Sequence, residues 1–147
     1  MNIRVSIDID APPAIVWMTV ETIEDHVDWM ADAEAIRFTT DEHRGVGTAF
    51  DCETKVGPLR LLDKMRVTEW ETARVMGIEH HGLVTGRGRF TLEAIANDRT
   101  RFTWTETLTF PAKMGGAAGA LAAKPVLTQI WRRNLRRLKE IVESGST

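Results

Sequence analysis

The sequence predicts an α+β fold in which a seven-stranded antiparallel sheet packs against one long C-terminal helix. Three observations predict it. The first residues alternate between apolar and polar side chains, a long middle region repeats that alternation between short turn signals, and the C-terminal region changes to helical spacing. The chain has 147 residues, 43% hydrophobic and 27% charged, which indicates one domain spanning residues 1–147 with a core of its own.

The N-terminal segment 3–9 is predicted to be a half-buried strand, because isoleucine and valine alternate there with polar residues. Pro12 and Pro13 end this strand. A proline fits the first turn of a helix, so Pro13 is expected to open a short helix over 14–20. A second short helix is expected over 23–29.

The middle of the chain is predicted to hold six further strands. They are expected over 33–41, 47–56, 58–70, 73–81, 84–96 and 99–110. The connections between them are short and rich in turn residues such as Gly57-Pro58 and Asn97-Asp98. Parallel strands need long crossovers, so these connections predict an antiparallel meander.

Beyond Pro111 the apolar residues recur at helical spacing and arginines fill the other faces, which predicts a long amphipathic helix. It is expected to begin near Met114, and Pro125 is expected to kink it or to start a second piece. The glycine-rich segment 115–119 weakens helix formation and is interpreted as a gate. The apolar stripe of this helix is the predicted cover for the apolar face of the sheet.

Alternation sorts each strand into two faces, and the charged residues mark the face toward water. The residues predicted to point inward are Phe50, Cys52, Thr54 and Val56; Leu59, Leu61, Asp63, Met65 and Val67; Gly86, Gly88, Phe90, Leu92 and Ala94; and Phe102, Trp104, Glu106, Leu108 and Phe110. Strand 73–81 has two possible phases. Arg74 favours His81 inside, hydrophobicity favours Met76, Ile78 and His80, and a bulge would satisfy both signals.

Asp63 and Glu106 are acids on inward positions, and one histidine of the pair His80-His81 is expected to join them. A buried carboxylate without a partner is costly. The first interpretation is therefore an ion pair with arginine, or a strand end open to water. The second is a solvated cavity in which an acid orients a ligand or transfers a proton, and the small inward glycines favour it.

Composition excludes several classes of function. The formal charge of −2 lacks the basic excess typical of nucleic-acid binding. Adjacent histidines on a strand point to opposite faces, and His26 and His43 lie in surface-like contexts, so no metal site and no cofactor is predicted. Cys52, the lone cysteine, is interpreted as a small core residue. No apolar run of membrane-spanning length occurs, and a cytoplasmic protein is expected.

Several local phrases in this order resemble one known superfamily. They are Ala11-Pro12-Pro13-Ala14-Ile15-Val16-Trp17, Asp28-Trp29, Val46-Gly47-Thr48-Ala49-Phe50, Arg66-Val67-Thr68-Glu69-Trp70, Thr100-Arg101-Phe102-Thr103-Trp104 and the helix end 135–143. The chain resembles the START-like, or SRPBCC, helix-grip superfamily, and within it the polyketide cyclase/dehydrase and lipid-transport branch. The resemblance implies a curved sheet that grips the last helix around a ligand cavity. Members bind lipids, polyketides, quinones, hormones or aromatic molecules, and a minority catalyse cyclisation, dehydration or aromatisation.

The first functional hypothesis is binding or transport of a small hydrophobic ligand. The predicted ligand-binding residues are Phe50, Cys52, Asp63, Met65, His81, Phe90, Trp104, Glu106, Phe110 and Met114. The second hypothesis is a cyclase or dehydratase in which Glu106 or Asp63 acts as general acid or base with a histidine partner, His80 or His81. The third is a protein-interaction or stress-response module that uses the outer sheet and the arginine-rich helix face.

Overall fold

The computed structural model describes residues 1–145, and their order of elements is the predicted one. The elements are β1 (Asn2–Ile9), α1 (Pro13–Val20), the 3-10 helix η1 (Ile23–Asp28), β2 (Ala33–Phe38), β3 (Ala49–Val56), β4 (Leu59–Glu71), β5 (Val75–His81), β6 (Thr85–Ala96), β7 (Arg99–Thr109), the 3-10 turn η2 (Ala112–Met114) and α2 (Gly116–Gly145). The seven strands form one antiparallel sheet in the order β1-β7-β6-β5-β4-β3-β2. The predicted α+β fold is confirmed.

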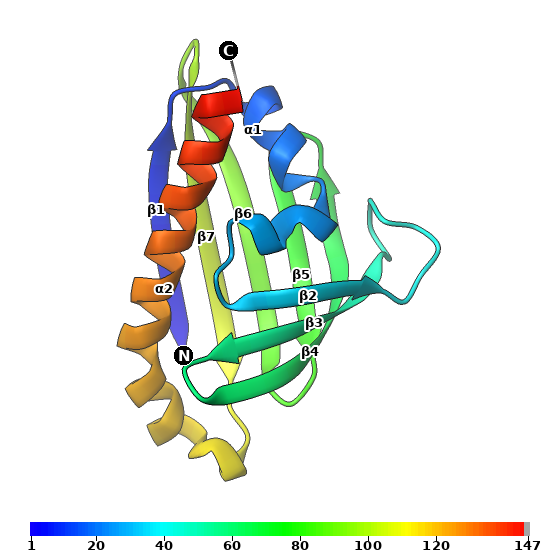
Figure 1. Cartoon of the computed structure of the whole chain (residues 1–147), viewed down its shortest axis with the longest axis vertical. Coiled ribbons are helices and arrows are strands. Elements are labelled where there is room, and N and C mark those ends of the chain that lie inside the picture. The colour runs from blue at the N-terminus through cyan, green and yellow to red at the C-terminus, as the bar shows by residue number, and fades with distance from the viewer. Residues whose placement is uncertain (146–147) are drawn as a thin grey trace.

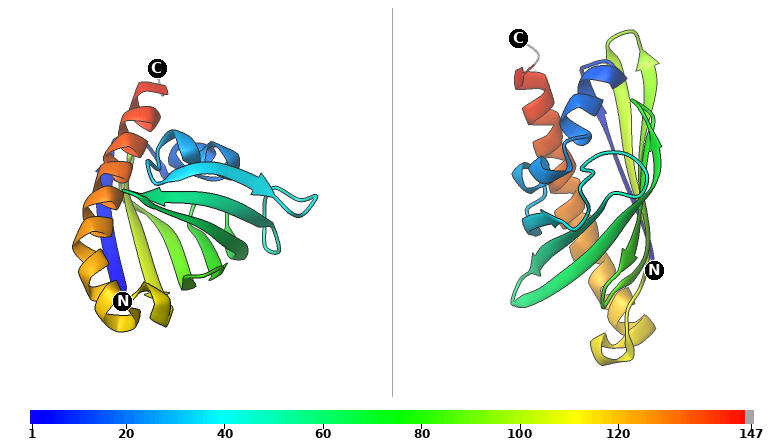
Figure 2. Two further views of the ribbon diagram at one scale, coloured as in Figure 1. Left: turned by 60° about the horizontal axis from the view of Figure 1, so that its bottom comes forward. Right: turned by 90° about the vertical axis from the view of Figure 1, so that its right-hand side faces the viewer.

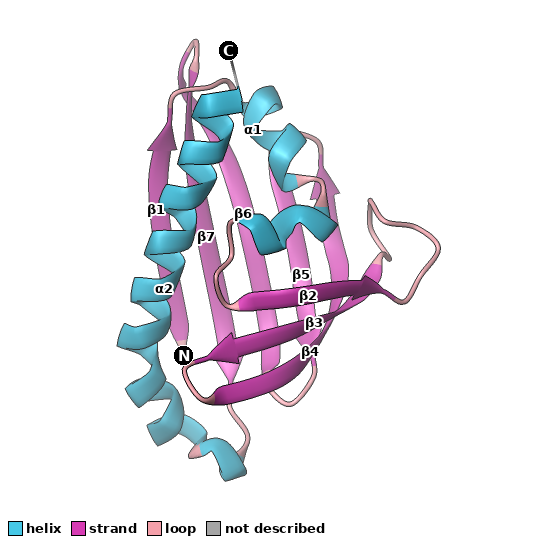
Figure 3. Cartoon of the chain, in the orientation of Figure 1, coloured by secondary structure: helices cyan, strands magenta, loops and turns pink. Residues whose placement is uncertain are grey.

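The sheet is strongly curved, and α2 runs along its inner side (Figures 1 and 2). The helix packs on β1 and β7, while β2, β3 and β4 sweep across the front of the molecule. The longest connection, residues 39–48, joins β2 to β3 and projects from the sheet (Figure 3). It makes β2 and β3 shorter than predicted, because Gly45 and Gly47 adopt positive φ angles of 90° and 95° and turn the chain there.

The short helices α1 and η1 close one end of the fold. They bury Trp17 and Ile23, and Trp29, which follows η1, is buried with them. The Trp29 ring contacts Phe90 and Trp104 on the sheet, at centroid distances of 5.7 and 6.2 Å. This aromatic contact fills the interior beneath η1.

The inward phase of β5 is the one that hydrophobicity favoured. Met76 and His80 are buried, whereas His81 is exposed. Arg74 does not set the phase because it lies in the turn before the strand, next to Ala73 at φ 62°. A register shift between Val67 and Glu69 of β4 occurs where these two strands pair. The alternative that placed His81 inside is therefore wrong.

The helix α2 is continuous through Pro125, so it does not begin a second piece there. Proline removes the backbone donor that the carbonyl of Leu121 would need, but Leu121 is 73% exposed and water can reach that turn. The start differs from the prediction, because η2 ends at Met114 and Gly115, at φ 88°, separates it from α2. The buried stripe of α2 is the predicted apolar one, with Asn134 added to it.

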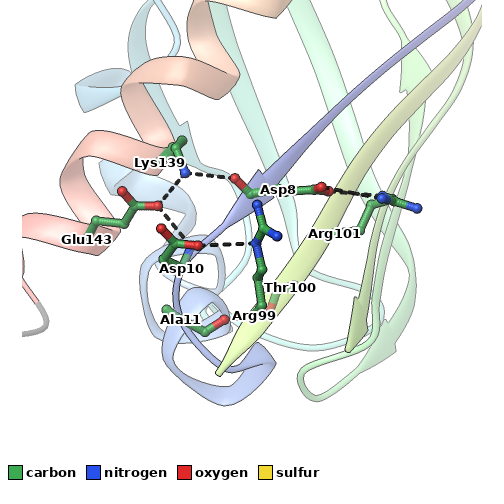
Figure 4. A network of polar contacts seen from close by, with 8 residues as sticks. All are labelled: Asp8, Asp10, Ala11, Arg99, Thr100, Arg101, Lys139 and Glu143. Carbon is green, nitrogen blue, oxygen red and sulfur yellow. Dashed lines mark hydrogen bonds and ion pairs between the residues drawn. The ribbon is translucent and has the colours of Figure 1, made fainter. Parts of the chain in front are cut away.

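Polar contacts fasten the C-terminal half of α2 to the sheet (Figure 4). Lys139 Nζ donates to the carbonyl of Asp8 at 2.9 Å, and Glu143 accepts from the backbone N–H of Asp10 at 2.8 Å. Arg101 pairs with the Asp8 carboxylate at 2.9 Å. Exposed contacts of this kind contribute little stability singly. The contacts from Lys139 and Glu143 join α2 to the end of β1, whereas the N-terminal half of the helix is mostly exposed.

Candidate functional site

A cavity of about 310 Å³ lies between the inner face of the sheet and the middle of α2. Its walls come from η1, β2 to β7 and α2, and they include Val56 and Leu59 at the β3–β4 hairpin and Met114 of η2. The apolar lining includes Met30, Ile36, Phe50, Val56, Leu61, Met65, Met76, Ile78, Phe90, Trp104, Leu108, Phe110, Leu127 and Trp131. Trp104 stacks on Trp131 with ring centroids 4.6 Å apart, so sheet and helix meet beside the cavity through two indoles.

The structure brings together all of the predicted ligand-binding residues except His81. Phe50, Cys52, Asp63, Met65, Phe90, Trp104, Glu106, Phe110 and Met114 line the cavity. The side chain of His81 is 48% exposed and lies 3.6 Å from Glu79 on the outer face. Because adjacent residues of a strand point to opposite faces, His80 takes the inward place. The placement of His81 at the site is corrected to His80.

Glu106 and His80 form a buried pair, with Nε2 of His80 2.9 Å from a carboxylate oxygen of Glu106. The second oxygen of Glu106 accepts a hydrogen bond from Trp104 Nε1 at 3.1 Å. The partner of the buried acid is thus histidine, not the arginine of the first interpretation. His80 is 8% exposed, and its Nδ1 has no hydrogen-bond partner among residues 1–145.

The electrostatic environment favours the protonated form of His80. Burial, the strongest influence, lowers the pKa of His80, but the hydrogen bond and charge of Glu106 and the charge of Asp63 oppose it. The net pKa lies above the ordinary value of 6.5. Glu106 and Asp63 therefore favour the protonated form of His80 relative to a free imidazole, and the second ring nitrogen, Nδ1, has no hydrogen-bond partner among the described residues.

Asp63 is the second polar group of the site. One of its carboxylate oxygens accepts a hydrogen bond from Thr54 at 3.0 Å. Burial raises the pKa of Asp63, while the charge of His80 and the Thr54 hydroxyl oppose that rise. A carboxyl group with a raised pKa is a stronger base once it is ionised. This is the property expected of a carboxylate that accepts a proton from a ligand in a cavity.

Sequence reasoning missed a third polar group of the site, Asp32, which lies in a turn and contacts side chains of α2. Asp32 accepts hydrogen bonds from Trp131 Nε1 at 3.1 Å and from Asn134 Nδ2 at 2.8 Å. Asp32 lines the cavity although it precedes β2 in a turn. Asn134 is 1% exposed on the apolar stripe of α2, and a buried amide at such a position is the signal that indicates a polar partner.

His26 was expected at the surface, but the structure buries it to 5% exposure in the cavity wall. Its Nε2 lies 2.7 Å from the carbonyl of Val20, so this nitrogen carries the proton and donates. Burial lowers the pKa of His26 to about 4, partly offset by that hydrogen bond. The imidazole is therefore neutral at physiological pH.

Acidification should destabilise the protein through His26. A folded pKa of about 4 against 6.5 in the unfolded chain means that protonation favours unfolding as the pH falls from 6.5 to 4, by up to about 3 kcal/mol. We expect His26→Gln, which keeps a donor for Val20, to lose this part of the pH dependence. The measurement is the free energy of unfolding in urea at several pH values, followed by tryptophan fluorescence.

The comparison isolates His26 because the other titrating groups are common to both proteins. His80 acts in the opposite direction, since its raised pKa gives stability that is present below 6.5 and lost as the pH rises through the folded pKa. His43→Gln, which removes an exposed histidine, is the control. Equal pH slopes for wild type and His26→Gln would contradict the assignment.

Cys52 also lines the cavity, and burial raises the pKa of its thiol to about 12. The thiol stays protonated at physiological pH and is a poor nucleophile, in agreement with its interpretation as a core residue. Among the described residues 1–145, no group of three histidine, cysteine or acidic side chains is placed to hold a metal ion. No helix in that part of the chain is long and apolar enough to cross a bilayer.

Comparison with known proteins gives a family and several solved structures of the same fold. The family described as polyketide cyclase / dehydrase and lipid transport matches residues 1–143. No curated protein sequence matches the chain significantly. The structure of TTHA0849 from Thermus thermophilus is 18% identical, with each chain covered to 100% and a TM-score of 0.79.

Two further solved structures have the same fold. The Zhui aromatase/cyclase from Streptomyces sp. R1128 is 17% identical, with 97% of this chain and 93% of that chain covered, and has a TM-score of 0.75. A START superfamily protein from Mycobacterium smegmatis is 11% identical, with 99% of each chain covered and a TM-score of 0.75. At these identities the likeness establishes the helix-grip fold.

Proposed function

The chain belongs to the polyketide cyclase / dehydrase and lipid transport family, and we propose that it binds a small hydrophobic ligand in the cavity between its sheet and α2. The observation that carries this proposal is the cavity itself. Its volume of about 310 Å³ lies within the range of small-molecule sites, and its walls are almost wholly apolar. Burial of an apolar ligand there supplies the binding free energy, at about 25 cal/mol per Å² removed from water.

The polar groups of the cavity give this ligand an orientation. His80, Glu106 and Asp63 lie on the sheet side, whereas Asp32 lies where β2 meets α2. A few polar groups in an otherwise apolar pocket are typical of sites that fix one pose of a ligand.

We expect ligands of this kind to raise the melting temperature. The test is a thermal-shift screen of lipids, flavonoids and quinones, with tryptophan fluorescence as a second readout because Trp104 and Trp131 line the cavity. At a concentration about a hundredfold above its Kd, a ligand stabilises the folded state by about 2.7 kcal/mol, or about 5–10 °C for a chain of this size. The absence of any shift across the panel would contradict the proposal.

A second candidate function is proton-transfer catalysis on a poly-β-carbonyl substrate, and the buried His80–Glu106 pair beside Asp63 supports it. One of the solved structures of the same fold is an aromatase/cyclase. In such a reaction a base removes a proton from the carbon between two carbonyl groups. The resulting enolate carbon attacks a further carbonyl carbon of the same chain, whose C=O π bond opens to an alkoxide, and that alkoxide takes up a proton from an acid. Asp63 has the raised pKa that such a base requires, and His80 is the acid that would stabilise the enolate oxygen.

Glu106→Gln separates the two candidates. The glutamine is isosteric and keeps an acceptor for Trp104, so ligand affinity should stay within about threefold of wild type. In an enzyme, turnover should fall by about a hundredfold, because His80 loses the charge that holds it protonated. If turnover is unchanged in Glu106→Gln, the His80–Glu106 pair has no catalytic role. If the variant loses ligand binding and the wild type shows no turnover, Glu106 belongs to the ligand site alone.

A further inference from the structure

Two polar groups of the cavity face the same space without touching each other. Asp63 and His80 lie on the inner faces of neighbouring strands, and the register pairs His80 with Met65, two residues along β4 from Asp63. They are thus diagonal neighbours, whose separation allows a third atom between them. The described residues show a charge interaction between the two groups and no hydrogen bond.

Each group has an unused hydrogen-bonding position. His80 gives Nε2 to Glu106, and its Nδ1 has no partner in the described chain. One oxygen of Asp63 is bonded to Thr54, and its other oxygen has no hydrogen-bond partner within residues 1–145. With the imidazole protonated, Nδ1–H is a donor and the free carboxylate oxygen is an acceptor. A group that lies between His80 and Asp63 and satisfies both must therefore accept one hydrogen bond and donate another, and the described residues supply no such group.

We propose that the ligand is neutral and carries a hydroxyl group, which accepts a hydrogen bond from Nδ1–H of His80 and donates one to the carboxylate of Asp63. This inference rests on the proposed ligand-binding function and names the chemical class of the ligand. A phenol or alcohol on an apolar ring or chain fits it, because the rest of the cavity wall is apolar. The hydroxyl is the smallest single group that satisfies both positions.

The charges of the cavity exclude an anionic head group. Asp32, Asp63 and Glu106 place three carboxyl groups in the wall, and the charge of a protonated His80 is already paired with Glu106. Arg89 also lines the cavity, but its guanidinium is paired with Glu69 at 2.8 Å and is 47% exposed. A carboxylate or phosphate would lie among like charges in a poorly solvated space, where repulsion is strong.

Other polar groups satisfy half of the pair. An ether or ketone accepts from His80 but gives nothing to Asp63. An ammonium donates to Asp63 but meets an imidazolium with an unpaired N–H. A donor or acceptor left without a partner in a buried site costs the free energy of its lost hydration, and this cost produces the discrimination.

The test uses probes that share one apolar ring system: 2-naphthol, 2-methoxynaphthalene, naphthalene and 2-naphthoate. Their Kd values are measured by equilibrium dialysis at pH 7. We expect 2-naphthol to bind about tenfold more tightly than naphthalene and 2-methoxynaphthalene, and 2-naphthoate to bind more weakly than naphthalene. Equal affinity for all four probes, or tightest binding of 2-naphthoate, would overturn the inference and leave the proposed function standing. Binding of none of them would contradict the proposed function itself.

Asp63→Leu tests the residue assignment. The variant should bind naphthalene at least as tightly as wild type, which also shows that it is folded, while the preference for 2-naphthol falls to about twofold or less. Asp51→Leu is the matched control, because Asp51 lies opposite Lys64 in the register of the same two strands, on their outer face. A preference for 2-naphthol that persists in Asp63→Leu, or that disappears equally in Asp51→Leu, would overturn the assignment.

Discussion

Leu61→Trp is expected to abolish ligand binding while the protein stays folded. Leu61 lies on β4, is half-buried and points into the cavity. Tryptophan at this position would place its ring system in the space that the ligand needs. In a filled core such a change costs about 1–3 kcal/mol, but here it enters a hollow, so we expect stability to change by less than about 1 kcal/mol. Affinity for any ligand found in the thermal-shift screen should fall by about a hundredfold or more.

The neighbouring position supplies the control. Leu62 points to the outer face and is 43% exposed, so Leu62→Trp adds the same side chain to the same strand outside the cavity. Ligand affinity should remain at the wild-type value in this variant. Equal loss of binding in both variants, or normal binding in Leu61→Trp, would show that the ligand does not occupy the cavity.

The sequence predicted the sheet well because its strands carry a local signal. In β1 every second residue is apolar, and the same alternation in β3 and β7 assigned both faces of those strands correctly. The position of α2 was predicted because it carries one long apolar stripe and because no other predicted helix is long enough to bury the apolar face of the sheet. Such patterns depend on neighbours within one element, and a single sequence contains them in full.

The exact pairing between strands could not be predicted from the alternation of residues within each strand. The phase of β5 depends on the turn at Ala73 and on the shift in the β4 register, neither of which alternation reveals. For this reason His81 was predicted at the site where His80 lies. Ala94, which was predicted to point inward, keeps its register opposite Thr100, but it is exposed because it lies near the end of β6.

The polar side of the cavity could be predicted only in part. Asp63 and Glu106 stood out because they are acids on apolar faces. His26 lies in the short 3-10 helix η1 and Asp32 in a turn, both too short to show a periodic pattern, and tertiary packing brings them to the cavity wall. Their partners are the carbonyl of Val20 and the side chains of α2, which are close in space and not indicated by spacing in the sequence.

The inward glycines have a different role from the one predicted. They were interpreted as small residues that leave space for a ligand. At Gly88 the space is occupied by the carboxylate of Glu106, which lies over this glycine on its way from β7 to His80 on β5. An added Cβ at Gly88 would lie 2.3 Å from an oxygen of Glu106. Gly88 is therefore what allows the buried pair to form across the intervening strand.

Gly88→Ala should break the His80–Glu106 pair and destabilise the protein by about 3 kcal/mol. The φ angle of Gly88 is outside the left-handed region, so the cost comes from displacement of a buried carboxylate from both of its donors. Displacement of Glu106 should also lower the pKa of His80, since that pKa is held up by Glu106. The measurements are urea unfolding and the NMR titration of the His80 ring.

Gly77→Ala makes the comparison decisive, because a glutamate lies over this glycine too. Its Cβ would lie 2.8 Å from an oxygen and 3.0 Å from the Cβ of Glu69, but the Glu69 side chain is 44% exposed and its partner Arg89 is 47% exposed, so this carboxylate can shift toward solvent. We expect a cost of about 1 kcal/mol or less there and an unchanged titration of His80. If both variants lose the same stability and neither alters His80, the glycine does not hold the pair in place. Unequal losses together with a lowered His80 pKa in Gly88→Ala alone would establish that one missing methyl group positions the ionisable pair of the cavity.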